Sequence, residues 1–146
     1  MGMFGILDIS SAGMDVQQAR LEAAASNIAN ARTTGENGAV YQPLTVVVHS
    51  AVAQEMGPAG TAISAGNLPL PTAEVVTQQD VMPKMVYDPG HPDADANGMV
   101  KLPGVDPVTS MVDLISISRG YEANLRAFDI TRSLLQRTLD LGRNNR

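Results

Sequence analysis

The feature that most constrains this chain is the segment from Asp106 to Gly142, whose pattern predicts one long, uninterrupted helix. Asp106 is a suitable N-cap residue, and Pro107 suits the first helical position, where its missing N–H is not needed. No further proline follows, and Gly142 is the expected stop after Leu141. A helix from Pro107 to Leu141 is roughly 52 Å long at about 1.5 Å per residue, and the mean helix has only about 11 to 12 residues. We therefore expect this helix to contact more than one partner.

Apolar residues of this segment recur every seven residues, which is typical of a coiled-coil seam. One column of the repeat consists of Met111, Ser118, Leu125, Arg132 and Leu139, and the column three positions on consists of Leu114, Tyr121, Phe128, Leu135 and Gly142. A second apolar stripe consists of Val112, Ile115, Ile130, Leu134 and Leu141. The two stripes together are wider than a two-helix seam requires, which again indicates several partners.

The N-terminal segment has the same kind of repeat. Leu7, Met14, Leu21 and Ile28 lie seven residues apart, and they predict an amphipathic helix from about Phe4 to Asn30. Many of the residues between them are alanines, which allow two helices to approach closely. Asparagine, threonine and glycine then replace the apolar repeat over residues 30–35, where we expect the helix to end.

The middle of the chain has a different composition. Most of the 9 prolines lie between residues 36 and 105, which excludes a long helix there. Val, Thr and Tyr content predicts short strands at Tyr41–His49, Ala73–Thr77, Met82–Tyr87 and Met99–Leu102, and a long loop at Val52–Leu70. We therefore predict a mainly α fold in which terminal helices pair as a coiled coil around a small β-rich or irregular segment. Its parts are residues 1–35, 36–105 and 106–146.

Charge and composition exclude several classes. A formal net charge of −5 with scattered arginines lacks the basic surface of a nucleic-acid-binding protein. The chain has no cysteine, so it has neither disulfides nor thiolate metal sites. No stretch is long enough to span a membrane, and residues 1–8 lack the pattern of a cleaved secretory signal. If this protein leaves the cytoplasm, we expect a non-cleaved route.

Candidate chemistry is concentrated between Asp88 and Gly98. Asp93, Asp95, Asn97 and Gly98 match the first half of an EF-hand calcium loop. The second half fails, because the twelfth position is Gly104 and prolines flank the loop where helices are required. Asp and Asn side chains that close tight turns are the simpler interpretation. We expect no metal and no cofactor.

No arrangement of residues indicates catalysis. His49 and His91 are the only histidines, and no phosphate-binding glycine loop or nucleophile motif is present. We therefore predict that the protein is not an enzyme and has no small-molecule substrate. An envelope enzyme that uses the Asp88 to Asp95 loop remains an alternative, for which a pocket around His91 would be the distinguishing observation.

Three separated motifs carry a resemblance to a known family. The N-terminal motifs ISSAGM (residues 9–14) and ASNIANA (residues 25–31), and the C-terminal motif SRGYEAN (residues 118–124), resemble the two ends of bacterial flagellar axial proteins. The segment VYDPGHPDAD (residues 86–95) resembles that of a proximal-rod member of the family. Each motif alone is weak, but their order and the length of the chain make the match specific. Another type III secretion axial, inner-rod or hook component remains an alternative.

This resemblance implies a structural subunit of the flagellar basal body. It implies export by the flagellar type III apparatus without a cleaved signal, and assembly in the periplasm into a helical rod that transmits torque from motor to hook. The implied partners are copies of the chain, other rod subunits, and components of the basal-body ring or the export gate. The residues expected to make the helix-pair and subunit contacts are Leu7, Met14, Leu21, Ile28, Met111, Leu114, Arg119, Tyr121, Glu122, Asn124, Leu125, Phe128, Leu135 and Leu139.

Overall fold

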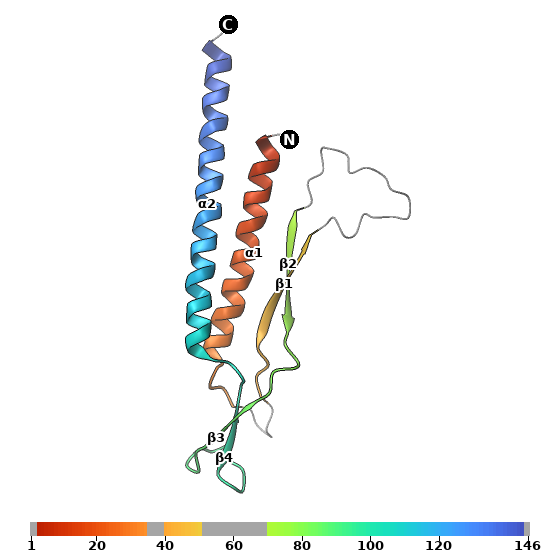
Figure 1. The fold of residues 1–146 in the computed structure, drawn as a ribbon, viewed down its shortest axis with the longest axis vertical. Helices are drawn as coiled ribbons and strands as arrows, with labels where there is room; N and C mark the ends of the chain where they lie inside the picture. Colours follow the sequence, from red (N-terminus) through yellow and green to blue (C-terminus); the bar gives the residue numbers. More distant parts are fainter. Residues whose placement is uncertain (1–2, 35–39, 51–69, 145–146) are drawn as a thin grey trace, which may run out of the picture. The chain divides into compact units, whose positions relative to one another are not determined.

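The computed structural model describes residues 3–34, 40–50 and 70–144. Its elements in chain order are α1 (Met3–Ala29), β1 (Leu44–Ser50), β2 (Pro71–Thr77), β3 (Lys84–Tyr87), β4 (Met99–Leu102) and α2 (Pro107–Asn144). In the sequence, two long helices flank a β region of two separate two-stranded sheets, β1–β2 and β3–β4 (Figure 1). The prediction of long terminal helices around a small β-rich middle is confirmed. The loop predicted at Val52–Leu70 lies outside the described residues, except for Leu70.

The two helices begin where the sequence predicts, but α2 ends later. Its 38 residues continue through Gly142 to Asn144, so the prediction that Gly142 stops the helix is wrong. Within the described part of the chain, the only glycine with a positive φ is Gly98, so Gly142 has not turned into the left-handed conformation that ends a helix. A glycine inside a helix costs about 1 kcal/mol relative to alanine, and the continuing backbone hydrogen bonds outweigh this cost.

Asp106 caps the start of α2, as the sequence predicts. Its carboxylate accepts hydrogen bonds from the backbone N–H of Val108 at 3.2 Å and from that of Thr109 at 3.4 Å. The Thr109 hydroxyl donates a third hydrogen bond at 2.5 Å. The side-chain hydrogen bond from Thr109 lowers the pKa of Asp106 most, and the Val108 backbone N–H lowers it further. The cap therefore favours the ionised carboxylate.

Three of the four strands have bounds that differ from the prediction. β1 begins at Leu44 rather than Tyr41, and β2 begins at Pro71, two residues before Ala73. β3 begins at Lys84 rather than Met82, because Pro83 has no N–H to donate to a neighbouring strand. β4 has the predicted bounds and pairs antiparallel with β3, with Lys84 opposite Leu102 and Tyr87 opposite Met99.

The chain forms two compact units, each assembled from separated segments. One contains the described residues of 1–19, 48–74 and 117–146, and the other those of 20–47 and 75–116. The buried residues of the first unit are Ser10, Val16 and Thr131, and those of the second include Ala23, Ala31, Val100 and Pro103. These buried side chains are small, in keeping with an aromatic content of only 3%. Large apolar side chains therefore remain available at the surface.

Candidate subunit-contact surface

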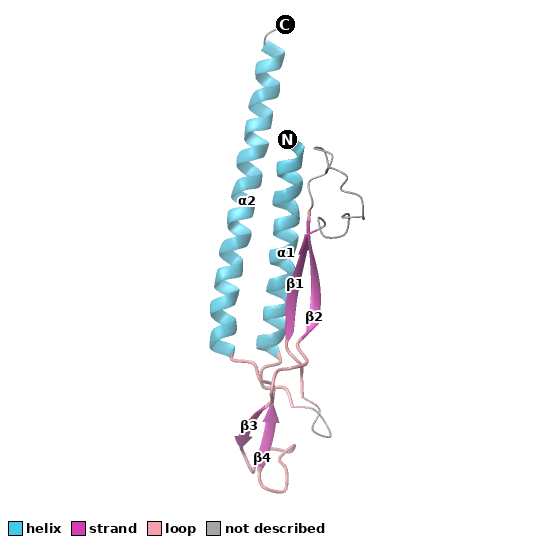
Figure 2. Ribbon diagram, turned by 45° about the vertical axis from the view of Figure 1, so that its right-hand side comes forward, coloured by secondary structure: helices cyan, strands magenta, loops and turns pink. Residues whose placement is uncertain are grey.

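The helices α1 and α2 approach each other closely in the first unit. A Cβ atom placed on Gly13 of α1 would lie 2.9 Å from the Asn124 Nδ2 atom of α2. One turn away, a Cβ atom on Gly120 of α2 would lie 3.1 Å from the Gln17 Nε2 atom of α1. Residue numbers rise along α1 from Gly13 to Gln17, while those of their partners on α2 fall from Asn124 to Gly120. The two helices are therefore antiparallel here (Figure 2).

The inner face of α2 is defined here as the residues of its 117–144 segment that are buried or half-buried. It consists of Ile117, Ser118, Gly120, Asn124, Phe128, Thr131, Ser133 and Leu135. Phe128 and Leu135, which belong to one predicted column, lie on this face. Leu125 and Leu139, from the other predicted column, are exposed. The sequence predicts that Phe128 and Leu135 alternate with the column of Ser118, Leu125 and Arg132. On the inner face they alternate instead with Ile117, Asn124 and Thr131, each one residue earlier in the sequence.

The predicted apolar column of α1 is partly shielded. Leu7, Met14, Leu21 and Ile28 are all half-buried. The most buried residues of this helix are instead the small Ser10, Val16 and Ala23. The apolar repeat does not predict burial of these three residues, although the alanines of this segment indicate close helix packing. A small side chain lets a neighbouring backbone cover it, so small residues can be the most buried ones.

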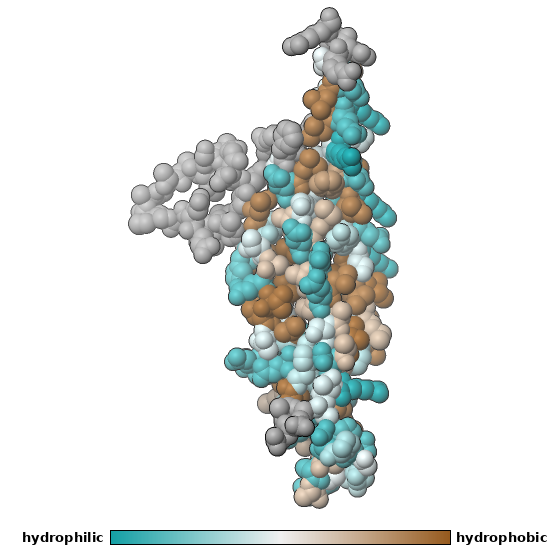
Figure 3. Space-filling view, turned by 180° about the vertical axis from the view of Figure 1, so that it is seen from behind, coloured by the Kyte–Doolittle hydropathy of each residue, from teal (hydrophilic) through white to brown (hydrophobic). Residues whose placement is uncertain are grey.

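The outer apolar face of α2 is defined here as its exposed large apolar residues. These are Val108, Met111, Val112, Ile115, Tyr121, Leu125, Ile130, Leu134, Leu139 and Leu141. They include every residue of the second predicted stripe. Met111 is 54% exposed and Leu139 62%. In the view of Figure 3, the C-terminal part of α2 has apolar atoms along one side and polar atoms along the other.

The C-terminal end of α2 extends beyond the start of α1. Both close contacts join residues whose numbers sum to 137, since 13 + 124 and 17 + 120 give the same value. By this relation Met3, the first residue of α1, lies level with Leu134. Figure 1 shows α2 continuing past the N-terminal end of α1. Leu139 and Leu141 therefore lie on a part of α2 that has no α1 residues beside it among those described.

Polar residues predicted to make subunit contacts lie on the same helix. Arg119 and Glu122 are exposed, and Asn124 is half-buried because it lies over Gly13. Glu122 also has a partner within its own helix, since its Oε2 atom lies 3.8 Å from the Arg126 Nη2 atom. An exposed pair of this kind contributes little to stability, on the order of 0.3 to 0.5 kcal/mol. Glu122 and Arg119 therefore remain accessible to a partner.

A side-chain network at the end of α1 holds the start of β1. The Asn27 amide donates to the Leu44 carbonyl at 2.8 Å, and its oxygen accepts from the Leu44 N–H at 2.7 Å. The Tyr41 hydroxyl donates to the same oxygen at 3.0 Å and lies 3.1 Å from the Ser26 hydroxyl. The motif around Asn27 carries the family resemblance, but the sequence alone predicts no structural role for it. The unusual run Ser-Asn at a helix end was the available signal.

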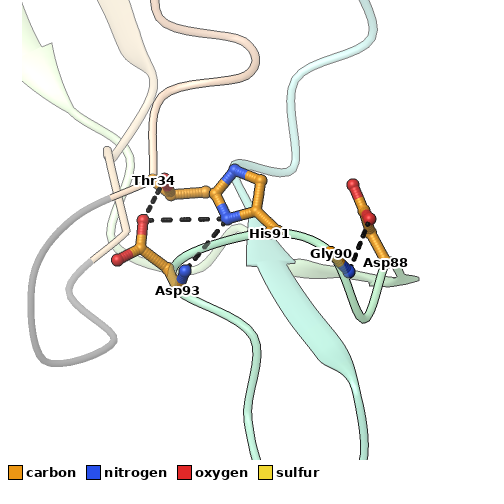
Figure 4. A network of polar contacts seen from close by, with 5 residues as sticks. All are labelled: Thr34, Asp88, Gly90, His91 and Asp93. Atoms are coloured by element: carbon orange, nitrogen blue, oxygen red, sulfur yellow. Dashed lines mark hydrogen bonds and ion pairs between the residues drawn. The ribbon is translucent and has the colours of Figure 1, made fainter.

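The loop between β3 and β4 is closed by its own acidic side chains. Asp88 accepts a hydrogen bond from the Gly90 N–H at 3.3 Å, and Asp95 accepts from the N–H groups of Asn97 and Met99 at 2.8 and 2.9 Å. The Thr34 hydroxyl donates to Asp93 at 2.6 Å (Figure 4). These contacts agree with the turn interpretation. Among the residues that the structure describes, no group of three potential ligands is arranged to hold a metal ion.

His91 accepts a hydrogen bond within this loop. The Asp93 backbone N lies 3.1 Å from its Nδ1 atom, and the Asp93 Oδ2 atom lies 3.9 Å from the same nitrogen (Figure 4). The histidine thereby helps to shape the turn.

Of the helices in the described ranges, neither is apolar enough over a sufficient length to cross a membrane.

Comparison with known proteins gives a consistent result. The family model "Flagella basal body rod protein" matches residues 7–35, and "Flagellar basal body rod FlgEFG protein C-terminal" matches residues 96–141. The flagellar basal-body rod protein FlgC of Salmonella typhimurium is 37% identical over 143 residues, which cover 97% of this chain and 99% of that protein. FlgC of Aquifex aeolicus is 37% identical over 144 residues, covering 96% and 97%. FlgC of Bacillus subtilis is 33% identical over 155 residues, covering 98% and 100%.

Proposed function

This chain belongs to the FlgC family of flagellar basal-body rod proteins and is a structural subunit of that rod, not an enzyme; from this premise we propose that α1 and α2 pair as a coiled coil whose outer apolar face binds neighbouring rod subunits. The chain assembles with other rod subunits in the basal body. The proposal concerns which of its residues make those contacts. We propose that residues 1–35 and 106–146 form the coiled-coil helices and that residues 36–105 form the β-rich segment between them.

The observation that carries this proposal is the position of the large apolar side chains. The half-buried Leu7, Met14, Leu114, Phe128 and Leu135 are suited to packing within one chain. The outer apolar face of α2 is exposed in the single chain. This many exposed large apolar side chains on one helix are unfavourable in water unless another molecule covers them. The polymer supplies that cover, because an interface that does not close on itself generates a helical assembly.

The energy available from this face is large enough to hold subunits together. Burial of one Leu, Ile or Met side chain contributes about 1.5 to 3 kcal/mol when it is complete. The outer apolar face contains many such side chains, and each is already partly covered by its own helix. A few of them per subunit are therefore sufficient when the contact repeats along a rod. Arg119, Tyr121 and Glu122 supply polar contacts that give the interface its direction, whereas Asn124 is already placed over Gly13 within the chain.

Leu125→Asp tests the proposal. Leu125 is 41% exposed and lies outside the inner face of α2. We expect the purified full-length variant to retain its helix content by circular dichroism. In cells whose own copy is deleted, we expect it to abolish rod assembly and swimming, because a buried carboxylate in the subunit interface is strongly unfavourable. Electron microscopy of isolated basal bodies and swimming assays measure the result.

Arg126→Gln is the matched control. Arg126 follows Leu125 directly and is exposed, but it lies on the polar side of the same helix with Asp129 and Asp140, and the substitution makes the same change of −1 in net charge. Assembly and swimming should persist in this variant. Normal swimming of the Leu125→Asp strain would refute the assignment of the outer apolar face to subunit contacts.

The route and the wider function are part of the same proposal. We propose export by the flagellar type III apparatus without a cleaved signal, and placement in the periplasmic part of the basal body. Contacts with ring or export-gate components, transmission of torque from motor to hook, and a position in the proximal rod also follow from this premise. The rod subunit's mechanical role fits a chain whose long helices present repeated apolar side chains along their length.

A further inference from the structure

Two reciprocal contacts join α1 and α2 in the first unit. At one, the Asn124 side chain of α2 covers Gly13 of α1, and its Nδ2, Cγ and Oδ1 atoms lie 2.9, 3.2 and 3.3 Å from where a Cβ would be. At the other, the Gln17 side chain of α1 covers Gly120 of α2, with Nε2 and Cδ at 3.1 and 3.2 Å. Each helix therefore provides one glycine and one amide. We refer to these four residues as the glycine–amide clasp.

The apolar residues of α1 cannot by themselves choose one alignment with α2. Leu7, Met14, Leu21 and Ile28 lie seven residues apart, so a slip by seven residues places each where the next one was. Leu114, Tyr121, Phe128 and Leu135 repeat in the same way. Such a slip moves α2 along α1 by about 10.5 Å and still sets large side chains against large side chains. Another feature must distinguish the alternatives.

The clasp makes this distinction. After a slip of seven residues in one direction, Asn124 is level with Arg20 and Gly13 with Thr131, because the paired numbers then sum to 144. In the other direction, Asn124 is level with Ile6 and Gly13 with Ile117, because they sum to 130. In either case the amide of Asn124 meets a side chain where it now meets a glycine. In both slipped alignments the Asn124 side chain must therefore leave the place that it occupies over Gly13.

We propose that the glycine–amide clasp of Gly13, Asn124, Gly120 and Gln17 determines the register of α1 against α2. This inference rests on the helix pairing of the proposed function but not on its subunit contacts. The register in turn determines how far α2 extends beyond α1. A slip would displace Leu139 and Leu141 by about 10.5 Å relative to α1, so the surface offered to a neighbouring subunit would change.

A distance between two spin labels tests the register in the full-length chain. The chain has no cysteine, so cysteines introduced by Asp15→Cys and Arg137→Cys are the only labelling sites. Both positions are exposed and belong to the first unit. In the clasped register Asp15 is level with Glu122, about 22 Å along the helix axis from Arg137. A slip of seven residues changes this axial separation by about 10.5 Å, in opposite senses for the two directions.

The test variant carries Gly13→Ala and Gly120→Ala, and we expect its label distance to shift or to split into two populations. The matched control is Gly142→Ala, which makes the same change in the same helix where nothing lies within 4 Å. We expect the control to keep the single distance of the unsubstituted chain. A double-alanine variant with the same single distance as this control would overturn the proposal.

A transposed variant separates register from mere loss of stability. It carries Gly13→Asn with Asn124→Gly, and Gly120→Gln with Gln17→Gly, so that each contact still has one glycine and one amide. We expect the original distance to return, and a displaced or broad distribution would count against the clasp. A broad distribution in the unsubstituted chain would also overturn it. Failure of the subunit contacts leaves this measurement unchanged, because Leu125 and the outer apolar face take no part in it.

Discussion

The Asn27 side chain, near the end of α1, forms two hydrogen bonds with the backbone of Leu44, as a neighbouring strand could. Its side-chain oxygen accepts from the N–H of Leu44 at 2.7 Å, and its NH2 group donates to the C=O of Leu44 at 2.8 Å. The Tyr41 hydroxyl, which also lies near Ser26, donates to the same oxygen. One side chain therefore turns the chain from helix to strand, and only an amide of this length has both the donor and the acceptor needed.

Asn27→Asp should reduce the free energy of unfolding by about 1 to 3 kcal/mol, because the Leu44 carbonyl loses its donor and faces a carboxylate oxygen instead. Urea unfolding of the full-length chain measures the loss. Asn97→Asp is the matched control, since Asn97 is exposed in the β3–β4 loop and the change is the same. Equal losses in the two variants would show that the Asn27 contacts contribute nothing specific.

Gly98 occupies the one position of the β3–β4 loop where the backbone requires glycine. Its φ is 74°, and a Cβ there would lie 2.9 Å from the Tyr87 Cε2 atom. We expect Gly98→Ala to destabilise the chain by at least about 1 to 2 kcal/mol, from the left-handed conformation alone. Gly90→Ala in the same loop would meet only an ordinary contact of 3.6 Å with Asp88, and it should be close to neutral. Thermal unfolding of the two variants compares them, and an inverted order would contradict this account.

At the scale of elements, α2 is a helix whose start is well determined and whose length exceeds what its own chain can cover. Asp106 and Thr109 hold its first turn through three hydrogen bonds. Its middle lies against α1 at the glycine–amide clasp. Its last turns carry Leu139 and Leu141 in the open. The helix therefore changes along its length from capped, to paired, to unpaired.

The cap makes the stability of α2 depend on pH under acidic conditions. Hydrogen bonds from Thr109 and Val108 lower the pKa of Asp106 below its ordinary 3.8, so ionisation is easier in the folded chain than in the unfolded one. Such a group stabilises the fold above its unfolded pKa, and this contribution is lost as the pH falls through the lowered folded value. We expect the unsubstituted chain to be more stable than Asp106→Asn at neutral pH, with the difference shrinking below about pH 4.

Circular dichroism during thermal unfolding, repeated across this pH range, measures the difference. Asp113→Asn, which removes an exposed carboxylate from the same helix, is the control and should not reproduce the effect. A gap between Asp106→Asn and the unsubstituted chain that stays constant with pH would show that ionisation of Asp106 does not contribute to the cap.

At the scale of the whole molecule, the burial pattern is the reverse of that of a self-sufficient domain. The buried residues include Ser10, Val16, Ala23 and Thr131, and large apolar residues such as Leu139 and Leu141 are exposed. Small residues permit close packing within the chain, and under the proposed function the large exposed ones are covered by neighbouring rod subunits. The stability of the assembled subunit then depends on the presence of other subunits.

The sequence alone determined the two long helices, the cap at Asp106, the short strands around the prolines and the membership of the flagellar axial family. These depend on local rules: proline has no N–H, Asp accepts hydrogen bonds at a helix start, and apolar residues recur with the helical period. The bounds of β1, and the continuation of α2 through Gly142, depend on contacts or conformations that no local pattern encodes.

Only the tertiary structure decided which face of α2 lies against α1. A seven-residue repeat is compatible with columns one residue apart, and hydrophobicity favours the column that contains Leu125 and Leu139 over the one that contains Asn124 and Thr131. The structure places the polar column inward, because Asn124 fits over Gly13 and Gln17 fits over Gly120. Close approach of two backbones depends on where both helices have small residues. That is a property of the pair, and neither helix contains it alone.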